Sequence, residues 1–160
     1  MACAVAIRSQ DLLFTAAVGR GLEHDLDGAA RQMVASLQGP AHPEYRYRSA
    51  LVLVDGLHAP PELLLEQLTL LTDGSYQFFG GGAGDNFAFV NTAVFYDDEA
   101  VNDAAVVLEI LSHKPLGIGF HHGWSPFSGP MQITGSHRQL VMSIDGRAAT
   151  FAGWNERPRV

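Results

Sequence analysis

The sequence predicts an α+β fold with two main helices and a mixed or largely antiparallel sheet, or two packed sheets. Two segments carry apolar residues at helical spacing, and the second lies between two strand-like runs, which makes one βαβ unit. In the second half, strand-like runs follow one another with connections too short for helices, which favours antiparallel pairing. The 160 residues, 47% hydrophobic and 17% charged, are typical of one compact domain.

The first expected elements are a hairpin and a helix. Ala2–Arg8 and Leu12–Val18 are β-like runs joined by three polar residues, a pattern typical of a hairpin. A helix is expected at about Asp27 to Gln38, because apolar residues recur on one face there, and Gly39-Pro40 ends it. Asp25 or Asp27 can accept hydrogen bonds from the free N–H groups of its first turn.

The βαβ unit is expected next. Ala50–Asp55 is a continuous apolar run, which is typical of a strand covered on both faces. Pro60-Pro61 begins a leucine-rich helix, and Asp73-Gly74 ends it. Tyr76–Phe79 then forms a short strand, which is parallel to the first strand because a helix connects the two.

Further strands fill the second half and form a meander. Asp145-Gly146-Arg147 after them opens a last short helix or a turn. The expected strands are Val90–Tyr96, Ala104–Leu111, Leu116–His121, Met131–Thr134 and Leu140–Ile144.

A glycine-rich run before Asn86 is the most conspicuous candidate site. It follows a strand but lacks the Gly-Lys-Ser/Thr ending of a phosphate-binding loop, and no helix begins after it. Glycines let a ligand or another chain approach closely, and Asp85 and Asn86 add an acceptor and a donor, which suits a small ligand with an ammonium or hydroxyl group. A bulge or a sheet-corner turn explains the glycines equally well. The candidate ligand-binding residues here are Gly81, Gly82, Ala83, Gly84, Asp85 and Asn86.

A pair of histidines followed by Gly123 and a tryptophan is the second candidate. Adjacent strand residues point to opposite faces, so the two histidines cannot readily chelate one metal, and we expect no metal site. One histidine is expected to satisfy a backbone group and the other to face a pocket, which Trp124 lines unless it fills core space instead. The candidate ligand-binding residues of this segment are His121, His122 and Trp124.

Catalytic patterns are missing from the sequence. There is no Gly-x-Ser-x-Gly nucleophile motif, and the lone cysteine, Cys3, lies in an apolar stretch, where a packing role is commoner than a nucleophilic one. We therefore expect no enzyme activity and no cofactor.

Charge and cysteine content narrow the expected partners and compartment. The formal charge is −7, and the ten basic residues are scattered, so nucleic acid and an anionic membrane surface are poor partners. A single cysteine excludes an intramolecular disulfide and fits a reducing compartment, so we expect a cytoplasmic protein. No apolar stretch approaches the 18 residues that a membrane-spanning helix needs.

Several runs together resemble one known family. Gly-Gly-Gly-Ala-Gly-Asp at 80–85 and His-Gly-Trp at 122–124 stand in the order of the FIST N-terminal domain, and over residues 5–149 the chain is similar to that family. Other runs that carry the resemblance are Ala16–Gly21, Ala50–Gly56, Thr92–Asp97, Asn102–Val106 and Ile144–Ala149.

The resemblance implies a sensory, small-ligand-binding module with amino acids as suggested ligands and with no catalytic residue. Such domains typically stand beside a second, C-terminal FIST domain and beside signalling output domains. Residues 1–149 are expected to form one domain that is partial at both ends relative to the family, and residues 150–160 a divergent polar tail.

The predicted function is therefore that of a cytoplasmic signal-transduction module that binds a small polar, amino-acid-like metabolite. A C-terminal FIST domain or signalling partner in trans and a second copy of the chain are further expected partners. The alternative is a non-enzymatic protein-interaction or oligomerisation domain with an exposed strand edge. A hydrolase that uses Cys3 or a serine with a histidine is the third hypothesis.

Overall fold

A computed structural model describes residues 6–86, 88–119, 121, 123, 125–126, 129–137 and 140–149. The chain divides into two compact units, Met1–Ile118 and Gly119–Val160, and each unit is described by itself. The single domain predicted for residues 1–149 spans parts of both units and stays a prediction.

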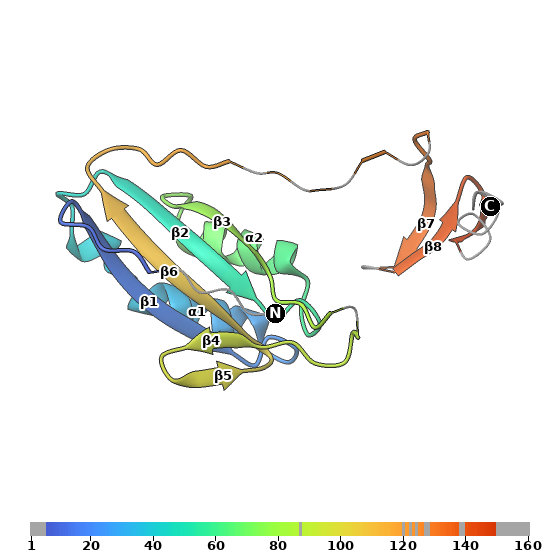
Figure 1. The fold of residues 1–160 in the computed structure, drawn as a ribbon, viewed down its shortest axis with the longest axis horizontal. Coiled ribbons are helices and arrows are strands. Elements are labelled where there is room, and N and C mark those ends of the chain that lie inside the picture. Colours follow the sequence, from blue (N-terminus) through green and yellow to red (C-terminus); the bar gives the residue numbers. More distant parts are fainter. Residues whose placement is uncertain are drawn as a thin grey trace. The chain divides into compact units, whose positions relative to one another are not determined.

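A four-stranded sheet in the order β1-β6-β2-β3 forms the centre of the first unit (Figure 1). Strand β6 is antiparallel to both of its neighbours, whereas β2 and β3 are parallel. This mixed, mostly antiparallel sheet with two helices confirms the predicted α+β fold. The strands are β1 (Leu12–Arg20), β2 (Tyr47–Val54), β3 (Gln77–Gly82) and β6 (Ala104–Ser112).

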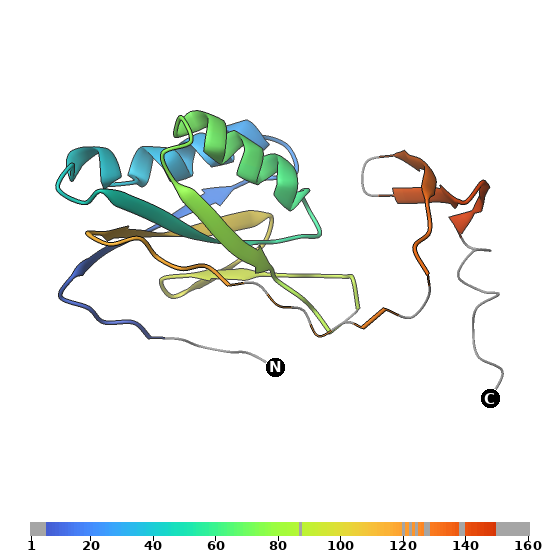
Figure 2. The ribbon, with the colours of Figure 1, turned by 90° about the horizontal axis from the view of Figure 1, so that it is seen from above.

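Two helices cover one face of this sheet (Figure 2). Helix α1 (Leu26–Ser36) begins after Asp25, whose carboxylate accepts a hydrogen bond from the Gly28 N–H at 2.8 Å, so the predicted cap is confirmed for Asp25. A short 3₁₀ turn, η1 (Gly39–Ala41), follows α1. Helix α2 (Pro61–Leu71) connects β2 to β3 and completes the predicted βαβ unit. The core between helices and sheet includes the fully buried side chains Met33, Leu64 and Leu68.

A small hairpin packs on the opposite face of the sheet (Figure 2). It consists of β4 (Val94–Tyr96) and β5 (Glu99–Val101), and its buried valines contact Ala104 and Val106. The hairpin covers only part of this face among the described residues, as the 44% exposure of the Leu53 side chain in β2 shows. The expectation that the strand at Ala50–Asp55 is covered on both faces is therefore wrong for the described part of the first unit.

The second unit holds a three-stranded antiparallel sheet in the order β7-β8-β9. Its strands are β7 (Ile133–His137), β8 (Leu140–Ile144) and β9 (Arg147–Ala148). These three strands follow one another as a meander, but the longer meander predicted for the second half is wrong at Ala104–Leu111, because β6 pairs with β1 and β2 of the first unit. Asp145 and Gly146 form the turn between β8 and β9, so of the two predicted alternatives, a short helix or a turn, the turn is confirmed at these residues.

Four predicted strands differ from the structure in place or extent. Residues 6–8 are not a strand, and residues 2–5 lie outside the described part. Among the described residues, β1 pairs with β6 alone. Val90–Tyr96 is a strand only from Val94, and residues 116–119 and 121 are not a strand. Tyr76–Phe79 is confirmed in type, but β3 continues to Gly82.

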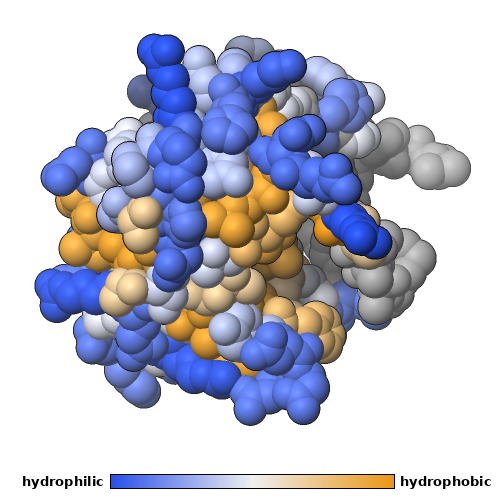
Figure 3. Space-filling model, turned by 90° about the vertical axis from the view of Figure 1, so that its left-hand side faces the viewer, coloured by the Kyte–Doolittle hydropathy of each residue, from blue (hydrophilic) through white to orange (hydrophobic). Residues whose placement is uncertain are grey.

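The surface combines charged side chains with apolar patches. On the side shown in Figure 3, hydrophobic side chains reach the surface between hydrophilic ones. Among the described residues, no helix has the length and apolar character that crossing a membrane requires.

Candidate functional site

The glycine-rich run is divided between a strand and a loop. Gly80–Gly82 form the end of β3 and pair in parallel with Val52–Val54 of β2. A Cβ atom at Gly80 would collide with the Val52 carbonyl oxygen, so this close approach of two strands requires glycine. A Cβ atom at Gly81 or Gly84 would meet open space. The predicted loop therefore begins at Ala83, and the first glycines serve strand pairing.

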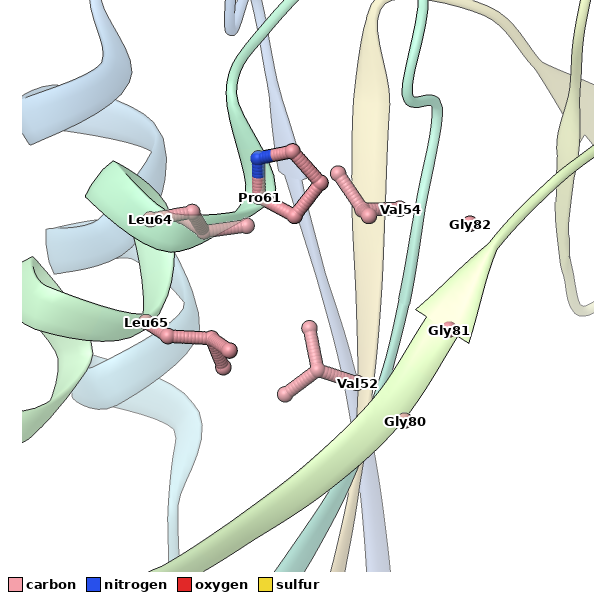
Figure 4. Close-up of a pocket in the computed structure, with 8 residues that line it drawn as sticks. All are labelled: Val52, Val54, Pro61, Leu64, Leu65, Gly80, Gly81 and Gly82. Atoms are coloured by element: carbon pink, nitrogen blue, oxygen red, sulfur yellow. The ribbon is translucent and has the colours of Figure 1, made fainter. Parts of the chain in front are cut away.

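An apolar pocket of about 110 Å³ lies between the end of β3 and the first turns of α2 (Figure 4). In Figure 4, side chains of α2 point toward the valines of β2, and the three glycines run along one side. The lining side chains are apolar, so the glycine backbone supplies the polar groups. The pocket is lined by Val52, Val54, Pro61, Leu64, Leu65, Gly80, Gly81 and Gly82.

Asp85 organises the loop that follows β3. Its carboxylate accepts hydrogen bonds from the N–H groups of Phe89 at 3.0 Å, Val90 at 2.7 Å and Asn91 at 3.1 Å. These donors, Val90 first, lower the pKa of Asp85 below its ordinary value. Because the carboxylate holds the backbone of this loop, residues 88–91 are not a strand, and the predicted acceptor at the mouth of the site is already engaged.

The residues of the predicted histidine–tryptophan segment do not belong to the same unit as the glycines, or lie outside the described residues. His121 belongs to the second unit, where its side chain is exposed and takes part in an interaction, whereas the glycines and Asp85 belong to the first unit. His122 and Trp124 lie outside the described residues. A single ligand site formed by both segments therefore stays a prediction.

Sequence reasoning missed a buried carboxylate, Asp55, directly after β2. It accepts hydrogen bonds from the Asp103 N–H at 2.8 Å, the Leu57 N–H at 3.2 Å, the His58 imidazole Nδ1 at 2.7 Å and the Thr92 hydroxyl. The signal was an aspartate at the end of an apolar strand run. Its partners come from distant parts of the chain, so the sequence does not indicate them.

Asp55 stays ionised although it is fully buried. Burial would raise the pKa of Asp55, but the hydrogen bonds, from Thr92 first, outweigh this effect and leave the pKa below its ordinary value. The carboxylate thereby ties together the loop before α2, the segment before β4 and the start of β6. We call Asp55, His58, Thr92 and Asp103 the Asp55 cluster.

The Asp55 cluster has part of the chemistry of a hydrolase site. A carboxylate that orients an imidazole is two-thirds of a catalytic triad, whose nucleophile must donate to the imidazole. Here the Thr92 hydroxyl donates to the carboxylate instead, so the described residues supply no nucleophile to His58. The described residues also hold no group of three or more His, Cys, Asp or Glu side chains that could bind a metal ion. The cluster's evident role is to hold three loops together.

A second buried carboxylate, Glu109, lies on the helix-covered face of β6. It accepts hydrogen bonds at 2.8 Å from the N–H groups of Gln38 and Gly39, where the chain leaves α1, and one from the Tyr76 hydroxyl. Burial, together with the bond to Glu109, raises the pKa of Tyr76. This arrangement fixes the end of α1 to the sheet and contacts no pocket lining described above.

A comparison with protein families finds a match for this chain. A family model described as FIST N domain matches residues 2–147 of the 160. The match includes β1 to β8, the glycine end of β3 and the Asp55 cluster. A comparison with curated proteins found no match.

Proposed function

Because the chain belongs to the FIST N domain family, a family of sensory and signal-transduction domains, we propose that it is a sensory module that binds a small, amino-acid-like metabolite. The observation that carries the proposal is the pocket beside the glycine end of β3. Family membership supports the sensory role, and the pocket supports the proposal that a small ligand binds beside β3.

The pocket lining suggests how such a ligand would be held. A protein cavity of about 150 Å³ lined by apolar side chains can hold benzene, so about 110 Å³ suits a short aliphatic group. Polar groups of the ligand would bond to the backbone of Gly80–Gly82, where no side chain blocks access. Asp85 would act indirectly, by holding the loop after β3, because three N–H groups already occupy its carboxylate.

A thermal-shift screen with amino acids and other small metabolites tests the proposal. A ligand at one hundred times its Kd adds about 2.7 kcal/mol to the free energy of unfolding, which raises Tm by several degrees. Gly82→Val should remove this shift, because the new side chain fills the pocket. The variant should fold, since a Cβ atom at Gly82 comes no closer than 3.9 Å to the Val54 carbonyl oxygen and valine favours strands.

Gly84→Val is the matched control, because Gly84 is in the same glycine run but outside the pocket lining. The control should keep the ligand-induced shift. The proposal is wrong if no metabolite stabilises the protein at millimolar concentration, or if Gly82→Val binds as well as the native chain.

A second candidate function, protein interaction or oligomerisation, has its own support. β3 is an outer strand, and among the described residues only β2 pairs with it. Its sequence, Gln-Phe-Phe-Gly-Gly-Gly, has none of the charges or prolines that usually protect an exposed edge. Light scattering over a range of protein concentrations tests self-association, and Gly81→Lys should reduce it by placing a charge on the edge. A monomer at all concentrations rules out the self-associating form.

We propose binding without catalysis, in the cytoplasm, with the signal passed to a C-terminal FIST domain or a signalling protein in trans. The support is chemical: His58 has a carboxylate partner but receives no nucleophile from the described residues. A hydrolase panel on the native chain and on His58→Ala tests this, and any turnover that the variant loses would contradict it.

A further inference from the structure

The face of the sheet opposite the helices carries an apolar groove of about 630 Å³, which we call the open-face groove. Alternate residues of a strand point to the same face, and the groove follows this alternation across three strands. Ala16, Leu108 and Leu51 lie side by side in the register of β1, β6 and β2. The lining residues are Ile7, Phe14, Ala16, Leu51, Leu53, Phe95, Tyr96, Asp97, Val106 and Leu108.

The groove lining favours an uncharged occupant. Asp97, in the turn between β4 and β5, is the one charged side chain of the lining. Apolar side chains form the rest apart from the Tyr96 hydroxyl, and two of them remain largely exposed: Phe95 at 69% and Ile7 at 57%. A contiguous apolar surface of this kind normally marks a place where something binds. A charged occupant would lose hydration here without gaining a partner of opposite sign other than at one end.

The segment before β1 starts next to this groove and can reach it. Ile7 precedes β1 and already lines the groove, and residues 1–5 come just before it. Their sequence, Met-Ala-Cys-Ala-Val, has no charged side chain. Five residues extend over at most about 17 Å, and β1 and β2, separated by β6, lie about 10 Å apart, so the segment is long enough to cross the groove.

We propose that Met1–Val5 cover the open-face groove and complete the core on this side of the sheet. The segment is attached at Ala6, one residue from a groove-lining side chain, so it competes at high effective concentration with any second molecule. This inference goes beyond ligand sensing: it assigns the open face to the chain itself and leaves the edge of β3 as the strand surface for partners.

Cys3 makes the proposal directly testable, because it is the only cysteine of the sequence. The rate at which an aromatic disulfide reagent modifies Cys3 is measured in the native chain and in denaturant. We expect the native rate to be at least tenfold lower. Leu53→Glu and Phe95→Glu each place a charge in the groove, and each should raise the modification rate of Cys3 most of the way to its rate in denaturant. Two variants are used in case one of them fails to fold. Circular dichroism confirms folding.

Leu63→Glu is the matched control, because Leu63 is an exposed leucine of α2, on the other side of the sheet. It should leave Cys3 protected. The proposal is overturned if native Cys3 reacts as fast as in denaturant, or if the groove variants fold but leave its protection unchanged. Protection that disappears on dilution also overturns it, because a second copy of the chain then covers the groove.

Discussion

Val107 and Leu108 are neighbours in β6, yet Val107 is fully buried beneath the helices whereas Leu108 lines the open-face groove. The same contrast holds for Val52 and Leu53 in β2. Both faces are apolar, so side-chain type does not explain the difference. Chain connectivity does: β1, β2 and β3 run in one direction and follow one another across the sheet. Right-handed crossovers then place α1 and α2 on the same face.

The comparison separates two kinds of surface on one sheet. The helix-covered face is complete within the described residues, and its core is closed by long-range contacts to α1 and α2. Of the helices and strands described, the short β4–β5 hairpin packs on one end of the other face. An apolar strand pattern thus predicts that a face needs cover, but it does not say which element supplies it. The variants below test this difference, from the largest expected effect to the smallest.

Leu64→Ala should have the largest effect, because Leu64 is fully buried between α2 and the sheet. Removing a buried leucine side chain costs about 2–5 kcal/mol in the free energy of unfolding, including the cavity that remains. Chemical denaturation measures the change. Leu63→Ala, one residue earlier on the exposed side of α2, should change it by less than about 0.5 kcal/mol. Equal costs would mean that α2 does not cover this face as described.

Asp55→Asn should have the next largest effect, because Asp55 bonds both to the loop that precedes α2 on one face of the sheet and to the segment that precedes the β4–β5 hairpin on the other. His58 and Leu57 lie before α2, whereas Thr92 lies before the hairpin on the other face. An amide accepts at only one of its two ends, so buried donors lose a partner at about 1–3 kcal/mol. Thermal and chemical denaturation near pH 7 measure the loss. Asp98→Asn, in the exposed β4–β5 turn, is the control and should change stability little.

Acid titration of the same pair sharpens this test. The pKa of Asp55 is lowered from 3.8 in the folded protein, so the carboxylate contributes stability above that value. The contribution is lost as the pH falls through the lower, folded pKa. The native chain should therefore lose stability below about pH 4 more steeply than Asp55→Asn. If the native chain and Asp55→Asn lose stability equally steeply below about pH 4, another carboxylate dominates the loss of stability in acid.

The sequence predicted the local parts of this architecture well. The helices begin and end near the expected caps and breakers, since Asp25 and the Gly39-Pro40 pair act within one or two turns. The Asp55 cluster could not be predicted, because Thr92 and Asp103 reach the carboxylate from 37 and 48 residues along the chain. The sequence predicts a loop at the glycines for a similar reason: their pairing partner, Val52–Val54, is separated from them in the chain by helix α2. Asp85 likewise accepts hydrogen bonds from the N–H groups of Val90 and Asn91, at the start of the strand predicted for Val90–Tyr96.

Gly80→Ala should have an intermediate effect at the edge of the helix-covered face. The new Cβ atom would collide with the Val52 carbonyl oxygen, so β3 must move away from β2. Overpacking costs about 1–3 kcal/mol, and the lower half of that range is expected because an edge strand can shift outward. Gly81→Ala meets open space and should be nearly neutral in the same denaturation experiment. If both variants cost the same, β3 does not pair with β2 in this register.

Leu53→Ala should have the smallest single effect of the leucine variants on the sheet core. The Leu53 side chain is 44% exposed to solvent, so its truncation should cost about 1 kcal/mol, less than Leu64→Ala. The informative quantity is its coupling to Ile7→Ala, because both side chains line the open-face groove. A double-mutant cycle should give a coupling of about 0.5 kcal/mol if the segment before β1 packs against β2. Additive costs would show that the Leu53 and Ile7 side chains do not interact. The segment before β1 would then not pack against β2, and the occupant of the groove would have to be a binding partner.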